Sequence, residues 1–192
     1  FRSATRAVVR RGGTVIGRVQ GRVSPLPGGG DLIERISRAP LFAQERYNGE
    51  AGTLWRLTGI ESLALSGPVE LAADINGTLN DPLIRGVMRA RDARFESYQT
   101  GTVVTGVSAV GRFDGSRLQL RNISGQTPGG GTVTGSGDFD LAAARGFALD
   151  LRLNADNALL VQRDDLVARV TGPVRIASDG AGGIVSGRLT LN

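Results

Sequence analysis

The sequence of 192 residues contains no cysteine, no histidine and no lysine. Without cysteine, disulfides, zinc thiolate sites and thiol nucleophiles are excluded. Without histidine and lysine, a serine nucleophile lacks its usual activating bases. Aromatic residues make up only 5% of the chain, so a dense aromatic core is not expected either. We therefore predict a protein that is not an enzyme, with no catalytic residues, no metal site and no cofactor.

Two local motifs offer candidate chemistry, and neither supports it. Asp164 and Asp165 are adjacent carboxylates, but neighbouring residues on a strand point to opposite faces, so we predict a turn or strand-start role. The glycine-rich triplet at 135–137 precedes no helix and is therefore no phosphate-binding loop. A carbohydrate-acting β-helix would need inward carboxylates beside aromatic platforms, for which one tryptophan and two tyrosines are available.

The charge of the chain is carried unevenly. All 23 basic residues are arginine, with a net charge of +5 and an isoelectric point near 11.0. Because arginine alone raises the isoelectric point, this value does not indicate nucleic-acid binding, and no nucleic-acid partner is expected. Arginines gather before the first acidic residue, Asp31. This pattern indicates a solvated strand face or, alternatively, contact with anionic lipid headgroups or an acidic partner.

Strand-like alternation of apolar and polar residues fills most of the chain. Leu149, Leu151 and Leu153 alternate with Asp150 and Arg152, a period of two that is typical of a strand with one apolar face. The chain also holds 29 glycines, many of them in Asp-Gly, Asn-Gly and Gly-Gly turns. Such turns join successive antiparallel strands. The sequence contains no run of about 20 apolar residues, so no membrane-spanning helix is predicted.

These patterns predict one elongated all-β segment of a larger protein, residues 1–192, because the chain begins with Phe and ends within a strand pattern. Residues 1–30 are expected to form strands and a Pro/Gly linker, 31–59 a helical insert and 60–192 continuous strands. A helix is predicted from Asp31 to Arg38, capped by Asp31. A second helical turn is predicted around Thr53 to Thr58.

One short phrase occurs twice in the sequence. Residues 66–71 (SGPVEL) are echoed by residues 171–176 (TGPVRI). A repeated strand-turn-strand unit is typical of a sheet that grows in one dimension rather than a closed globule.

The order of several phrases resembles that of the TamB family, which is similar to the AsmA-like proteins. The resemblance is carried by residues 66–69 (SGPV), 77–82 (GTLNDP), 129–137 (GGGTVTGSG) and 157–166 (NALLVQRDDL), and extends from about residue 40 to residue 192. It implies a β-taco, a long curled sheet with an apolar groove, in the periplasmic part of a protein anchored in the inner membrane. The implied outer-membrane partner is a TamA-like barrel, bound through a C-terminal part expected to be missing here.

The candidate site is the apolar face of the predicted strands. Eleven residues are expected to line a groove that contacts lipid or a client protein: Leu71, Ile75, Met88, Val107, Phe113, Val133, Phe139, Leu149, Leu151, Leu153 and Val174. On the predicted first helix, Leu32, Ile33 and Ile36 are candidates for capping this groove. In a closed sandwich the same eleven residues would be core, and alternation alone does not separate the two; the resemblance favours an open groove.

The predicted function is a conduit that moves phospholipid between the inner and outer membranes, with acyl chains on the apolar face. The alternative is a chaperone-like scaffold for unfolded outer-membrane protein strands, acting through strand addition at sheet edges. A third interpretation is a passive stalk.

Overall fold

The computed structural model describes residues 3–11, 14–23, 31, 38–56, 61–78, 80–141, 148–179 and 182–192. Within them lie thirteen strands of one sheet and a single α-helix, α2 (Ala51–Trp55). The strands are β1 (Ser3–Arg11), β2 (Thr14–Val23), β3 (Leu41–Glu50), β4 (Leu63–Ser66), β5 (Pro68–Gly77), β6 (Pro82–Ser97), β7 (Thr102–Gly115), β8 (Arg117–Gln126), β9 (Thr132–Asp140), β10 (Leu149–Gln162), β11 (Val167–Ser178), β12 (Gly183–Gly187) and β13 (Thr190–Leu191).

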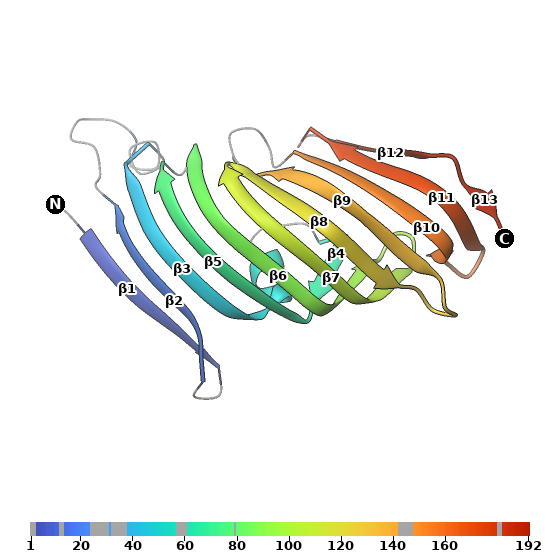
Figure 1. Cartoon of the computed structure of the whole chain (residues 1–192), viewed down its shortest axis with the longest axis horizontal. Coiled ribbons are helices and arrows are strands. Elements are labelled where there is room, and N and C mark those ends of the chain that lie inside the picture. The colour runs from blue at the N-terminus through green and yellow to red at the C-terminus, as the bar shows by residue number, and fades with distance from the viewer. Residues whose placement is uncertain are drawn as a thin grey trace.

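The strands lie side by side in nearly the order of the chain, from β1 at one end to β12 at the other (Figure 1). Each pairing along this path is antiparallel. Two short strands lie off the path: β4 pairs with the far half of β6, and β13 pairs with β11. At about 4.8 Å between neighbours, the path spans roughly 50 Å.

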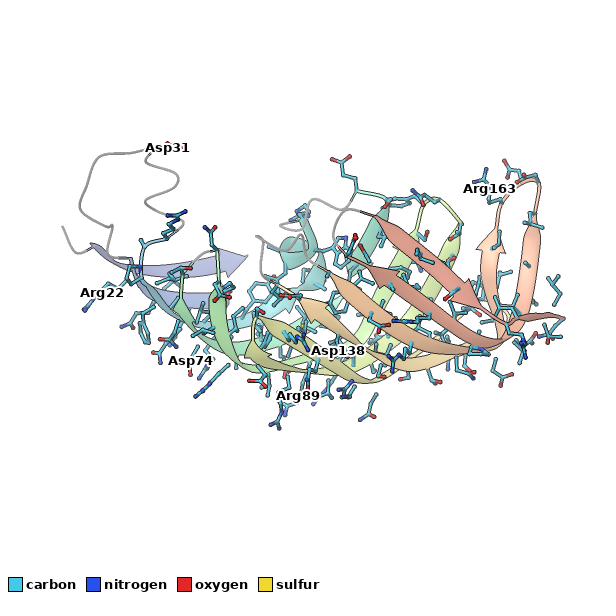
Figure 2. The ribbon with its side chains drawn as sticks, turned by 90° about the horizontal axis from the view of Figure 1, so that it is seen from above. Arg22, Asp31, Asp74, Arg89, Asp138 and Arg163 are labelled. Carbon is cyan, nitrogen blue, oxygen red and sulfur yellow. The ribbon has the colours of Figure 1, made fainter. Side chains whose placement is uncertain are left out.

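The sheet curls into an open trough instead of folding into two packed layers (Figure 2). The predicted all-β, elongated and curled antiparallel sheet is therefore confirmed, and the closed sandwich is not the architecture of the described residues. The short helix α2 lies inside the trough, on the concave side (Figure 2).

Three neighbouring strands bend at bulges, which together we call the crease: Asp92 in β6, Gly106 in β7 and Asn122 in β8. Their φ angles are +54°, +59° and +53°, and the pairing register shifts at each of them. An extra residue in one strand bends it and increases its twist. Aspartate and asparagine tolerate the left-handed conformation better than other side chains do. The crease thus gives a local cause for the curl.

Replacing Asn122 with valine is expected to destabilise the fold by about 1–3 kcal/mol, because a β-branched side chain is strained at positive φ. Asn122→Gly is the matched control and is expected to leave the free energy of unfolding nearly unchanged. Urea denaturation of both variants measures the difference. A valine variant as stable as the wild type would show that the crease does not require this conformation.

The two copies of the repeated phrase occupy equivalent places, each beside a bulge. Gly67 separates β4 from β5, and a side chain there would lie 3.1 Å from the carbonyl oxygen of Asp92. Gly172 lies in β11 next to the β10 bulge at Asn157, whose backbone N–H donates to Thr171 Oγ1 at 2.9 Å. Gly67 and Gly172 both have positive φ, +95° and +138°. The sequence echo thus corresponds to one structural unit used twice.

The prediction of a helical insert over residues 31–59 is wrong for Leu41–Glu50, which form β3 between β2 and β5. Hydrogen bonding on both sides outweighs the weak local signal of this segment, whose alternating positions include small and charged residues. The second predicted helical turn is present as α2, beginning at Ala51 instead of Thr53. Most of the predicted helix from Asp31 to Arg38, with Leu32, Ile33 and Ile36, lies outside the described residues.

Candidate functional site: an apolar inner face

Residues directly opposite each other on paired strands share a face of the sheet. Following these pairs from β5 to β11 links all eleven predicted residues on one face, which we call the inner face. They are Leu71, Ile75, Met88, Val107, Phe113, Val133, Phe139, Leu149, Leu151, Leu153 and Val174. The sequence pattern thus selected residues that the structure brings together.

The inner face is only partly covered. Val133 is 8% exposed, and the other ten predicted residues are half-buried. None of the described large side chains has an exposure below 2%. Leu71 and Met88 pack beside the cluster that α2 and β4 cover. No second sheet layer lies over the other residues, so their neighbours on the same face provide most of their burial.

Large and small residues alternate across the strands of the inner face. One row of cross-strand neighbours runs Met88, Gly111, Leu120, Gly137 and Leu151. A side chain added at Gly111 would lie 2.8 Å from Cδ1 of Leu118. Long side chains therefore lie over the glycines beside them, which closes the apolar surface without a second layer.

The opposite, outer face is polar. One row of cross-strand neighbours alternates in charge: Asp74, Arg85, Asp114, Arg117 and Asp140. In Figure 2 the labelled Asp74 and Arg89 point away from the trough. Asp138 and Asp140 lie on this same outer face, opposite Gln119 and Arg117. Charged residues are thus concentrated on the outer face, where Phe42, Leu83 and Val110 are exposed as single apolar residues.

Asp150 is the most heavily paired carboxylate of the outer face. It accepts hydrogen bonds from Arg175 Nε at 2.9 Å and Nη2 at 3.0 Å, and Arg152 lies 3.3 Å away. The hydrogen bonds and charge of Arg175, together with Arg152, lower the pKa of Asp150. The pair with Arg175 joins β10 to β11 from the solvent side, whereas Arg152 is on β10 itself. Each such exposed pair contributes little to stability.

One end of the inner face is covered by α2 and β4. Tyr47, Ala51 and Val69 form a buried cluster, against which Leu54 of α2 and Leu65 of β4 pack. The Tyr47 hydroxyl donates to the carbonyl of Glu50 at 2.8 Å. The short helix α2 therefore packs its apolar residues on the sheet.

A hollow of about 1110 Å³ lies beside α2 and β4. Its lining mixes polar and apolar groups and includes Trp55, Glu61 and Tyr98, but none of the eleven predicted residues. It therefore lies outside the part of the inner face that these eleven residues form.

A second cover lies beyond the crease, where β10 reaches back to the turn between β6 and β7. Gln162 N–H donates to Thr100 O, and Arg163 Nη1 donates to Gln99 O, both at 2.9 Å. Thr127, 4% exposed, accepts from Leu159 N–H at 3.0 Å. The contacts bridge past β8 and β9 over a buried cluster of Val133, Ala155, Ala158, Ala168 and Val170. The inner face is therefore covered at two places and open between them.

Several inner-face residues were not among the predicted set. Large apolar ones include Val69, Ile84, Leu118, Leu120, Ile123 and Ile176. The alternation of Leu118 with Leu120 is a signal that identifies two of them. Glu45 of β3 is the charged one, opposite Ala73 of β5. Its placement follows from strand pairing, which the sequence of β3 does not indicate.

The motifs considered for catalysis have structural roles. Asp164 and Asp165 are exposed in the turn between β10 and β11, where Arg163 and Leu166 exchange backbone hydrogen bonds, as predicted. Ser136 lies within β9. Over the described ranges, no group of three acidic residues is arranged to hold a metal ion.

No helix among the residues that the structure describes has the length and apolar character needed to cross a bilayer.

The fold and the inner face define an all-β protein whose distinguishing feature is a continuous apolar face on an open, curled sheet. Residues 121–192, which include part of β8 and all of β9–β13, match the family model of the TamB C-terminal domain. The resemblance is thereby confirmed for these residues, which are similar to the TamB family. This family is a transport and assembly component of the bacterial envelope and works with TamA. Neither a curated protein nor a solved structure matches the chain.

Proposed function

We propose that this chain is a periplasmic segment of a non-enzymatic conduit that moves phospholipid between the inner and outer membranes. Acyl chains lie on the inner face, and headgroups remain in the solvent at the open side of the trough. The observation that carries the proposal is the strand pairing from β5 to β11, which places the eleven apolar residues on one face across the bulges of the crease.

The energetics of acyl chains favour such an occupant. Each methylene transferred from water to an apolar surface gains about 0.8 kcal/mol when fully buried. The half-buried side chains of the inner face offer partial burial at many successive positions, which suits a long, flexible and unbranched ligand. Extended apolar surface of this kind marks a lipid or partner contact.

Replacing Leu151 with aspartate on the inner face is expected to abolish co-purification of phospholipid, because a charge there costs several kcal/mol against an apolar ligand. The measurement is native mass spectrometry with organic extraction of the chain purified gently from bacterial cells. Phe139→Asp provides a second inner-face variant. Asn154→Asp is the matched control, since Asn154 is exposed on the outer face of the same strand.

Phospholipid bound to the wild type and to Asn154→Asp, but lost from folded Leu151→Asp, is the expected result. Circular dichroism checks that the variants are folded. A folded wild type free of lipid, or a Leu151→Asp variant that keeps its lipid, would contradict the proposal.

A second candidate function is a chaperone-like scaffold for outer-membrane β-barrel or autotransporter assembly, together with a TamA-like partner. It is favoured by the last strands, where Ile184, Val185 and Leu191 are each more than 70% exposed. A sheet edge with exposed apolar residues suits strand addition by an unfolded client. This function predicts that proline at Val185 impairs client binding, whereas Leu151→Asp does not.

A further inference from the structure

The inner face carries one charged residue among its described positions from β3 to β12, and this residue is Glu45. It occupies the position of β3 between Ala43 and Tyr47, which are 8% and 6% exposed. Opposite it lie Ala73 on β5 and the position of Val19 on β2. A half-buried carboxylate therefore lies in an apolar surface that continues on both sides of it.

No countercharge for Glu45 comes from the strands that flank it. The inner-face positions of β2, β3 and β5 hold Tyr47 as their one other titratable residue, and its hydroxyl donates to the Glu50 carbonyl. Arg46 and Asp74 are on the outer face, and the carboxylate of Glu50 accepts from Gly67 N–H at 2.9 Å. Removal from water is accordingly the cause that raises the pKa of Glu45 above its ordinary value of 4.5.

We propose that Glu45 makes occupation of the inner face proton-linked. When an apolar ligand passes over β3, the Glu45 carboxylate takes up a proton. The inference rests on the proposed function, since it needs an apolar ligand on the inner face. An ionised carboxylate beneath an acyl chain would be a buried, unpaired charge, which costs far more than protonation does. Neutral glutamic acid removes this cost.

The sign of the linkage follows from the two states. The ligand covers Glu45 further, so its pKa is higher in the bound state than in the free state. Binding is therefore strongest below the free-state pKa, which itself lies above 4.5. Above that value affinity falls by up to tenfold per pH unit until the bound-state pKa is passed.

The experiment titrates the chain with diphenylhexatriene, a neutral fluorophore with no titratable group, between pH 5 and pH 8. We expect the wild type to bind at least about tenfold more tightly at pH 5 than at pH 8. Glu45→Gln is expected to bind with the same affinity across this range, close to the wild-type value at low pH. Glu70→Gln is the matched control because Glu70 is exposed on the outer face of β5, and it should behave like the wild type.

An NMR titration of the Glu45 side-chain carboxyl in the wild type, with and without the fluorophore, keeps the test independent of the variant's folding. We expect the pKa of Glu45 to rise on binding. If the fluorophore binds but Glu45→Gln keeps the wild-type pH dependence, or the pKa does not move, the inference is overturned while the apolar ligand site stands. Absence of fluorophore binding at every pH contradicts the proposed function and the inference with it.

Discussion

Gly86→Val is expected to destabilise the sheet by about 3 kcal/mol or more. Gly86 lies in β6 opposite Ala73 of β5. A Cβ at this position would lie 2.7 Å from the Ala73 Cα and would overlap the backbone carbonyl of Ala72. The higher strand preference of valine offsets at most about 1 kcal/mol. The steric overlap is larger, so the net change in stability is destabilising.

The measurement for Gly86→Val is thermal unfolding followed by circular dichroism, with an expected fall in the midpoint of roughly 6–12 °C. Gly182→Ala is the control, because no atom lies within 4 Å of a side chain built there and Gly182 does not require positive φ. That variant should unfold at or slightly above the wild-type temperature. A Gly86→Val protein with an unchanged midpoint would mean that β5 and β6 separate easily enough to admit a side chain.

Tyr47→Ala is expected to cost about 3–5 kcal/mol, the range for removing a large buried aromatic side chain. Tyr47 is 6% exposed and packs with α2, β4 and the inner face. Its ring also lies over Gly49, where a side chain would come within 2.8 Å of the ring. Its loss therefore removes a buried contact between β3 and α2.

Tyr47→Phe separates packing from hydrogen bonding, since it removes only the bond to the Glu50 carbonyl and should cost about 1 kcal/mol. Tyr98→Ala is the exposed control, because Tyr98 is 66% exposed. Chemical denaturation gives all three free energies of unfolding. Equal losses for Tyr47→Ala and Tyr98→Ala would show that the α2 cover contributes nothing to stability.

Much of the sheet and its inner face could be predicted from the sequence because the alternation in β5–β11 is regular and the turns between these strands are short. Once Leu151 and Leu153 are assigned to one face, antiparallel pairing carries that face across to Phe139 and Val174. The period of two is a local property, and it survives wherever one face is apolar and the other polar.

The rest depended on contacts between distant parts of the chain. The inner positions of β3 read Ala43, Glu45, Tyr47 and Gly49, which gives no hydrophobic alternation, so the strand is defined by its neighbours. The bridge from Gln162 to Thr100 joins residues far apart in the sequence, and no local pattern predicts it. Because the sequence does not predict β3 as a strand, it does not place Glu45 on the inner face either.

The nearly sequential order of the strands has a consequence for how the chain acquires its structure. Because most strands pair with the strand formed just before them, each new hairpin closes only a short loop, and the entropy cost of each step stays small. The sheet is therefore suited to form progressively from one end of the chain to the other, each finished strand serving as the template for the next. Its stability is then a sum over neighbouring strands, as in repeat proteins. Fraying at one end leaves the other end intact.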